Sequence, residues 1–190
     1  MNGEILANRS AANRSKSDYY ATPRECTQAL IDYLDLPKRY TIWEPACGSG
    51  EMSRVFEQNG YKVISTDIED RGFGGVEDFL TSAGKKCDWI ITNPPFSLSE
   101  QFIRKCFELK KPFAMLLKSQ YWHSKSRLSL FREREPMCVL PLTWRPDFEF
   151  GRRGGSPTME CIWTVWDECE TFCAPIYVPL EKPNMKGAEV

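Results

Sequence analysis

The sequence predicts an α/β domain with a mostly parallel, seven-stranded sheet and helices on both faces. The main indication is a strand, a glycine-containing turn, a helix, a second strand and an acidic residue, which follow one another between positions 40 and 67. Helical and apolar stretches keep alternating as far as position 166, as successive βαβ units do. The 190 residues, 42% of them apolar, suffice for one domain with a sizeable core.

The first element is predicted to be a helix that begins at the TPRE stretch 22–25, which has the form of a capping box with proline at the first helical position. It ends before Pro37, and a strand at 40–43 leads into the turn at 44–50. The remaining elements are predicted in this order: a helix that ends at Asn59-Gly60, a strand at 61–66 followed by Asp67, a glycine loop at 72–75, a strand at 89–91, a second capping box at 97–100 with a helix behind it, a strand at 112–117, a short basic helix at 124–134, and strands at 137–143 and 159–166.

The overall charge excludes one class of protein. With 25 basic and 26 acidic residues the formal net charge is −1, so the chain is not a globally basic nucleic-acid binder, although a local basic patch is compatible with this balance. No apolar run reaches membrane-spanning length and the first residues have no signal-peptide core, so we expect a cytoplasmic protein. We predict a disordered arm at 1–17, a folded domain at 18–180 and a loose tail at 181–190.

The eight cysteines include no CxxC pair and sit in a chain larger and more apolar than disulfide mini-proteins. We therefore expect reduced thiols that pack as small hydrophobic groups. A zinc site built from Cys161, Cys169 and Cys173 is the alternative, and no metal is expected otherwise.

A first chemical motif is the turn WEPACGSG at 43–50. Glycines that follow the first strand of a βαβ unit let the backbone approach a ligand closely, and Asp67, 23 positions after Glu44, is suitably spaced to hold ribose hydroxyls. The turn suits dinucleotides as well as other adenosine ligands, and a purely structural turn is also compatible with it. It reads GSGEMS rather than GxGxxG, which favours an adenosine ligand other than a nicotinamide cofactor.

A second motif is NPPF at 93–96, at the carboxyl end of a predicted strand, where ligands of open α/β sheets bind. Two consecutive prolines fix an extended backbone and remove two amide donors. Acceptors remain, namely the side-chain oxygen of Asn93 and the carbonyl of Pro94, beside the aromatic ring of Phe96. Acceptors next to a stacking ring suit a planar base with an exocyclic NH2 group.

The two motifs together resemble those of class I S-adenosylmethionine-dependent amino-methyltransferases, whose domain is Rossmann-like. The resemblance is strongest to DNA N6-adenine methyltransferases, especially small phage and prophage forms. It covers about residues 18–166. It implies methyl transfer from S-adenosylmethionine to the N6 amine of an adenine that is flipped out of DNA, leaving S-adenosylhomocysteine.

The resemblance also assigns roles to individual residues. Asn93 and Pro94 would bind the target amine, Pro95 would stiffen the motif, and Phe96 would stack on the target base. The cofactor residues would be Tyr20, Thr22 and Pro23 near the methionine end, Glu44 near the amino group, Pro45, Ala46, Cys47, Gly48 and Gly50 in the turn, Asp67 at the ribose, Ile68 on the adenine ring, Asp78 and Phe79 at the adenine edge, and Asn93.

A basic segment offers a place for the nucleic acid. Residues 118–153 hold eight basic and four acidic residues, a local charge of +4 in a chain of net −1. The alternative for the segment is a solvated surface with scattered charge. The alternative for Tyr121 and Trp122 is ordinary core packing. The candidate contacts are Lys118, Tyr121, Trp122, Lys125, Arg127, Arg145, Arg152 and Arg153.

Other substrates remain open at this point. Similar motifs occur in enzymes that methylate adenine in RNA, the exocyclic amine of cytosine, or a glutamine side chain. A non-catalytic protein that binds nucleic acid or S-adenosylmethionine on the same fold is an alternative of a different class. The sequence has no segment that fits a separate target-recognition domain, and it leaves the target sequence and the oligomeric state open.

Overall fold

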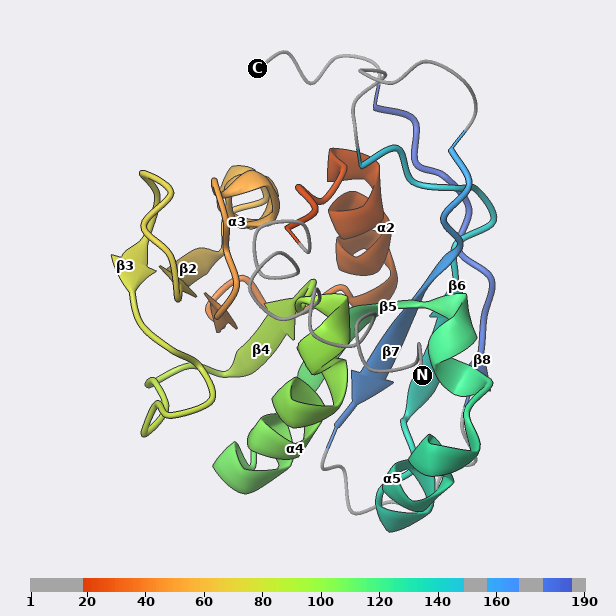
Figure 1. The fold of residues 1–190 in the computed structure, drawn as a ribbon. Coiled ribbons are helices and arrows are strands. Elements are labelled where there is room, and N and C mark those ends of the chain that lie inside the picture. Colours follow the sequence, from red (N-terminus) through yellow and green to blue (C-terminus); the bar gives the residue numbers. More distant parts are fainter. Residues whose placement is uncertain (1–18, 149–156, 168–175, 186–190) are drawn as a thin grey trace, which may run out of the picture.

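A computed structural model of the chain describes residues 19–148, 157–167 and 176–185. They form an eight-stranded sheet with helices on both faces (Figure 1). The strands are β1 Thr41–Glu44, β2 Lys62–Asp67, β3 Gly75–Val76, β4 Trp89–Thr92, β5 Phe113–Lys118, β6 Cys138–Pro141, β7 Cys161–Trp166 and β8 Ile176–Tyr177. The α-helices are α2 Arg24–Leu34, α3 Glu51–Gln58, α4 Ser99–Leu109 and α5 Leu128–Glu133, and short 3₁₀ helices occupy Phe96–Leu98, Ser119–Trp122 and Lys125–Arg127.

The strand order is β3-β2-β1-β4-β5-β7-β6-β8, and only β7 runs antiparallel to its neighbours. The chain passes from β1 outward to β2 and β3, then returns to place β4 on the other side of β1. The order therefore reverses between β1 and β4, and the crevice outside the carboxyl ends at such a point is where open α/β sheets bind ligands. Glu44 is the last residue of β1 and Asn93 directly follows β4, so both lie at this edge.

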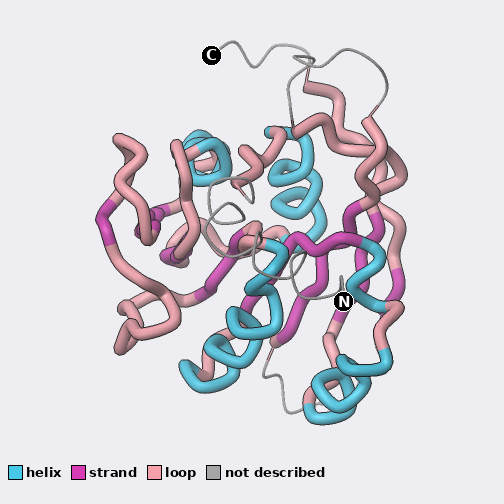
Figure 2. The backbone as a smooth tube through the Cα atoms, viewed as in Figure 1, coloured by secondary structure: helices cyan, strands magenta, loops and turns pink. Residues whose placement is uncertain are grey.

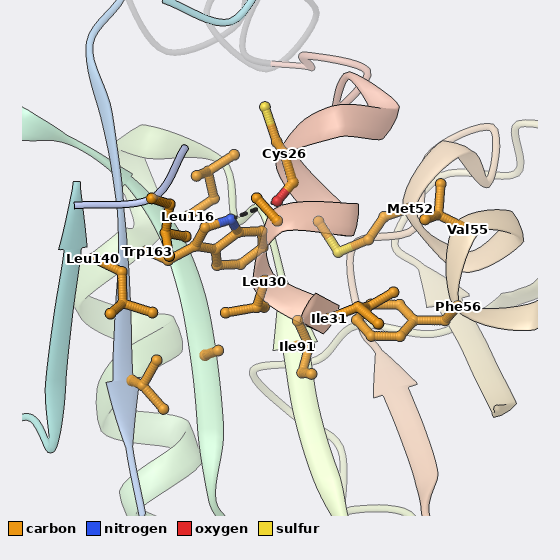
Figure 3. Packing of buried hydrophobic residues seen from close by; sticks show 14 of the residues in the cluster. Cys26, Leu30, Ile31, Met52, Val55, Phe56, Ile91, Leu116, Leu140 and Trp163 are labelled. Atoms are coloured by element: carbon orange, nitrogen blue, oxygen red, sulfur yellow. Dashed lines mark hydrogen bonds between the residues drawn. The ribbon is translucent and has the colours of Figure 1, made fainter. Parts of the chain in front are cut away.

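Successive side chains of the central strands point to opposite faces of the sheet and belong to two separate cores. Ile42 of β1 packs with helices α2 and α3 on one face, whereas the next residue, Trp43, packs with α4 on the other. Figure 3 shows the first core, in which the Trp163 indole donates a 2.9 Å hydrogen bond to the Cys26 carbonyl at the start of α2. The bond fixes the first turn of α2 against the antiparallel strand β7.

The predicted fold class is confirmed, with one difference in strand number. The sheet has eight strands rather than seven: the six strands located in the sequence are all present, and the two-residue strands β3 and β8 add one at each edge. Strands this short carry no periodic pattern that a sequence could display. Figure 2 shows how little of the β2–β4 connection is regular, since β3 is a short strand within a long loop.

Neither predicted capping box forms. The residue before α2 is Pro23, and no side chain caps this helix. Helix α4 begins at Ser99 rather than at 97, because residues 96–98 first make a 3₁₀ turn, and the Ser99 hydroxyl donates to the Phe96 carbonyl at 3.1 Å. The predicted basic helix at 124–134 is divided into a 3₁₀ turn and α5. Within the described ranges no helix is long and apolar enough to cross a membrane.

Candidate active site

A cavity of about 540 Å³ lies at the carboxyl edge of the sheet. Its walls come from residues 19–22, which we call the N-terminal segment, and from the loops that follow β1, β2, β3 and β4. The predicted cofactor residues that line it are Tyr20, Thr22, Glu44, Pro45, Ala46, Cys47, Asp67, Ile68, Asp78, Phe79 and Asn93. Pro23, Gly48 and Gly50 are buried behind this surface rather than on it.

Glycine at position 48 is required by the backbone and by a neighbouring ring. Gly48 has φ +55°, and a Cβ atom there would lie 2.1 Å from a ring carbon of Tyr19. Tyr19 is held over the turn, where its hydroxyl accepts a 3.1 Å hydrogen bond from the Ser49 amide and lies 2.6 Å from the Ser49 hydroxyl. The ring of Tyr19 therefore forms part of the cavity wall directly above the turn.

We expect Gly48→Ala to lower the free energy of unfolding by about 1–2 kcal/mol through left-handed backbone strain, and also to push Tyr19 out of the cavity wall. Gly60→Ala is the matched control, because Gly60 has φ +84° with nothing near its missing Cβ. Thermal denaturation should show the loss from left-handed strain in both variants and a larger loss in Gly48→Ala, whereas titration with S-adenosylmethionine should show weaker binding for Gly48→Ala alone. Equal affinity in the two variants would contradict this role of Tyr19.

Asp67 fastens the glycine turn to the end of β2. Its carboxylate accepts hydrogen bonds from the Gly48 amide at 2.8 Å and the Glu69 amide at 3.0 Å, and the residue is only 8% exposed. The side chain still lines the cavity. It therefore shapes both the turn and the cavity surface.

The cavity is strongly acidic. One side chain in its wall is a guanidinium, that of Arg71, which pairs with Glu69 at 2.7 Å. The carboxylates that line it are Glu44, Glu51, Asp67, Glu69 and Asp78. Such a wall attracts a cationic ligand and repels a polyanion.

Glu44 is the most deeply buried of these carboxylates, being 3% exposed at the end of β1. It accepts a short hydrogen bond from the Ser53 hydroxyl, which in turn lies 2.7 Å from the Ser65 hydroxyl. Burial raises the pKa of Glu44 well above its ordinary value, and the hydrogen bond from Ser53 offsets only part of this. A cation beside Glu44 would favour its ionised form.

Glu44→Gln should be more stable than the parent protein near pH 8. Because the pKa of Glu44 is higher in the folded than in the unfolded chain, its stabilising contribution is present below the ordinary pKa of 4.5 and is lost as the pH rises through the folded value. Glutamine does not titrate, so the difference in unfolding free energy should shrink as the pH falls. Urea denaturation across pH 4–8 measures it, with Glu57→Gln on the exposed side of α3 as control. A difference that does not depend on pH would contradict the account.

The apolar residues of the cavity wall differ in burial. Phe79 is buried, with its ring centroid 5.1 Å from that of Trp43 and 4.8 Å from that of Phe102. Ile68 is 65% exposed although it is a large apolar side chain. An exposed isoleucine at the mouth of a cavity suits a flat ring that would cover it.

The Asn93 amide is held in one orientation. Its Nδ2 donates to the Tyr20 carbonyl at 3.2 Å and to the Thr22 hydroxyl oxygen at 3.1 Å. A carbonyl only accepts, so the NH2 group must face the N-terminal segment. The buried Oδ1 has no hydrogen-bond partner within the described part of the chain. The site thus carries an unused acceptor on a residue that lines the cavity.

The rest of the NPPF motif surrounds this amide. Pro94 is buried, Pro95 lines the cavity, and Phe96 lies outside it, in the wall of a separate groove with Tyr121 and Arg127. The Phe96 ring centroid is 5.3 Å from that of Tyr20. Lys118, at the end of β5, places Nζ 4.3 Å from the centre of the Phe96 ring, a cation–π contact.

The predicted nucleic-acid residues are only partly brought together. Trp122 stacks on Phe131 at 4.2 Å, and Arg127 packs over Tyr121 at 4.0 Å, which agrees with the packing alternative for the two aromatic residues. Arg145 pairs with Glu160 at 2.9 Å. Lys125 is exposed. Arg152 and Arg153 lie outside the described residues, as does the predicted arm at 1–17.

Some residues of the site gave no signal in the sequence. Tyr19 and Arg71 line the cavity because residues 19–22 and the loop after β2 cross the glycine turn, and neither path follows from a local pattern. Glu51 lines it as the first residue of α3. Of the candidate zinc set, Cys161 is buried, and Cys169 and Cys173 lie outside the described residues. Among the residues that are described, no three His, Cys, Asp or Glu side chains gather as a metal site would require.

No protein-family model matches the chain, but two curated relatives are similar in sequence. Type II methyltransferase M.EcoRI from Escherichia coli is 29% identical over 94 residues, which are 47% of this chain and 29% of that protein. Type II methyltransferase M.TthHB8I from Thermus thermophilus is 27% identical over 148 residues, which are 65% of this chain and 34% of that protein. The chain spans about a third of the length of these relatives.

Solved structures extend the likeness to most of the chain. A type I restriction-modification system methyltransferase subunit from Streptococcus thermophilus superposes with a TM-score of 0.62 at 12% identity, covering 84% of this chain and 47% of that chain. A Listeria monocytogenes protein assigned as a class I S-adenosylmethionine-dependent methyltransferase gives 0.56 at 13% identity, covering 86% and 66%. The 23S rRNA methyltransferase ErmE gives 0.56 at 15% identity, covering 82% and 72%. The chain therefore has the fold of class I S-adenosylmethionine-dependent methyltransferases, and its sequence is similar to type II methyltransferases.

Proposed function

We propose that this chain transfers a methyl group from S-adenosylmethionine to the exocyclic N6 amine of adenine in DNA. The observation that carries the proposal is the Asn93 amide, whose NH2 group is engaged and whose buried oxygen is left without a partner on a residue that lines the cavity. The similarity to two type II methyltransferases supports DNA as the substrate.

The cavity fits the proposed cofactor. S-adenosylmethionine carries two positive charges and one negative charge, so a wall of five carboxylates and one guanidinium favours it. The same wall would repel the pyrophosphate of a dinucleotide, the alternative that the glycine turn alone leaves open. The volume of about 540 Å³ also lies within the range of small-molecule sites.

The cofactor residues divide by chemistry. Glu44 would hold the ammonium group, Asp67 the ribose hydroxyls, and Asp78 the edge of the adenine, whose ring would lie on Ile68. When bound, S-adenosylmethionine supplies a methyl group on a positively charged sulfur that is ready to be attacked. The protein then has to exclude water and align the incoming amine.

The NPPF residues would prepare the amine. An adenine amine is a poor nucleophile because its lone pair is delocalised into the ring. Hydrogen bonds from its two protons to the Asn93 oxygen and the Pro94 carbonyl would favour a more tetrahedral nitrogen with its lone pair available. Positive charge develops on that nitrogen during attack, and fixed acceptors stabilise it.

The duplex conceals this amine, so the base would be flipped out at a cost of a few kcal/mol. Stacking of the base on Phe96 would return about 1–3 kcal/mol. Lys118 contacts one face of the Phe96 ring, so either Lys118 moves away when the base binds or the base stacks on the opposite face. The basic segment 118–153 would contact phosphates beside the site.

Methyl transfer from radiolabelled S-adenosylmethionine to double-stranded DNA, single-stranded DNA and total RNA, assayed in parallel, tests this proposal. Label in DNA supports it. Label in RNA alone would retain the chemistry and replace the substrate. A protein that binds the cofactor but labels no nucleic acid would overturn the proposal and leave a protein substrate or a binding role.

A further inference from the structure

We propose that Thr22 is a positioning residue that, together with the Tyr20 carbonyl, turns the Asn93 amide so that its oxygen faces the amine to be methylated. This inference rests on the proposed function. It gives Thr22 a task other than contact with the methionine end of the cofactor, the role that family resemblance suggests.

Two acceptors occupy both protons of the amide. The Thr22 hydroxyl oxygen lies 3.1 Å and the Tyr20 carbonyl oxygen 3.2 Å from Asn93 Nδ2. Because each proton of the NH2 group has its own acceptor, a half-turn of the amide would place Oδ1 against the Tyr20 carbonyl, which cannot donate, and would require the Thr22 hydroxyl to become the donor. The Oδ1 atom is buried and lacks a partner within the described ranges, so only a ligand, a solvent molecule or a residue outside those ranges can satisfy it.

The Thr22 hydroxyl is free for this task. A threonine just before a helix ordinarily caps it, but α2 has no side-chain cap and its preceding residue is Pro23. Thr22 is 5% exposed, which makes its bond to Asn93 a buried one. The two residues are 71 positions apart, so the contact fixes the N-terminal segment against the end of β4.

Removing the hydroxyl should therefore lower the rate of the chemical step and leave the affinity for the cofactor unchanged. In Thr22→Val the amide is held by the Tyr20 carbonyl alone, so side-chain orientations in which Oδ1 is turned away from the substrate become populated. An NH2 group there would meet the donor protons of the amine instead of accepting them. The rate should then fall while the cofactor, which does not depend on this orientation, binds as before.

The test is the single-turnover rate of methyl transfer to DNA, measured together with the dissociation constant of S-adenosylmethionine by calorimetry. Thr22→Val should be slower by about tenfold, the effect of one hydrogen bond, with cofactor affinity within about twofold of the parent. Thr22→Ser should recover most of the rate. In an Asn93→Ala background, Thr22→Val should have no further effect, because Thr22 acts through Asn93.

Thr27→Val is the matched control. Thr27 lies in the first turns of α2, five positions after Thr22, is fully buried, and has a hydroxyl without a partner in the described structure, so its loss should leave the rate unchanged. Equal slowing in both valine variants would overturn the inference. So would a weakened cofactor affinity with an unchanged rate in Thr22→Val, which would make Thr22 a cofactor ligand.

A second measurement separates this inference from the proposed function. If the parent protein labels no nucleic acid, the proposed function fails, and exchange of the Asn93 side-chain amide protons by NMR still tests the positioning. Faster exchange in Thr22→Val than in the parent and Thr27→Val would support it, and identical exchange in all three would overturn it. If Thr22→Val is too unstable for kinetics, the same NMR measurement still tests the positioning. Thr22→Ser keeps the hydroxyl, so its Asn93 amide protons should exchange as slowly as those of the parent.

Discussion

Replacing Asn93 with alanine is expected to lower the rate of methyl transfer at least about 100-fold. The variant loses an acceptor that acts on the amine as positive charge develops, so the loss falls on the transition state. Cofactor binding should change little, because the charged and apolar walls of the cavity are intact. Single-turnover kinetics and cofactor titration on the same preparation measure both effects.

Two results would contradict this role of Asn93. Unchanged turnover would show that the buried acceptor takes no part in the reaction. An equally large loss of cofactor affinity would move Asn93 from the amine to the cofactor. The first result would also remove the basis for assigning Thr22 as a positioning residue.

Replacing Asp67 with alanine is expected to weaken S-adenosylmethionine binding at least about tenfold and to lower the melting temperature. The variant leaves the Gly48 and Glu69 amides without their acceptor and removes a negative charge from the cavity. The loss therefore has a structural part and an electrostatic part.

Asp67→Asn separates the two parts. Asparagine keeps the shape and one acceptor oxygen but loses the charge, so it should recover most of the melting temperature and only some of the affinity. Calorimetric titration and thermal denaturation of the three proteins measure this. Full affinity in Asp67→Ala would refute the ribose contact, and full affinity in Asp67→Asn would show that the charge has no effect.

Local patterns predicted the elements that depend on local chemistry. The strand, glycine turn and helix at 40–58 were predicted because an apolar run, turn residues and helical spacing follow one another there. The helix ends at Gln58, directly before the Asn-Gly stop at 59–60. The edge at which Asn93 and Glu44 meet also followed from the sequence, since both come directly after strands of a parallel sheet.

Non-local contacts could not be predicted in the same way. The capping box at 22–25 fails although its residues are suitable, because the Thr22 hydroxyl bonds to a residue 71 positions away. Tyr19 and Arg71 join the cavity through the path of the backbone over the glycine turn, where Arg71 lies 4.4 Å from the centre of the Tyr19 ring. Neither position shows a periodicity or spacing that marks it in advance.

Identifying the methylated nucleoside decides whether the methyl group goes to the exocyclic amine of adenine. DNA would be incubated with the protein and S-adenosylmethionine carrying a deuterated methyl group, digested to nucleosides, and analysed by mass spectrometry beside an Asn93→Ala control. We expect deuterated N6-methyladenine that is strongly reduced in the control. Label on a ring carbon, as in 5-methylcytosine, or N6-methyladenine in equal amount from Asn93→Ala, would contradict it.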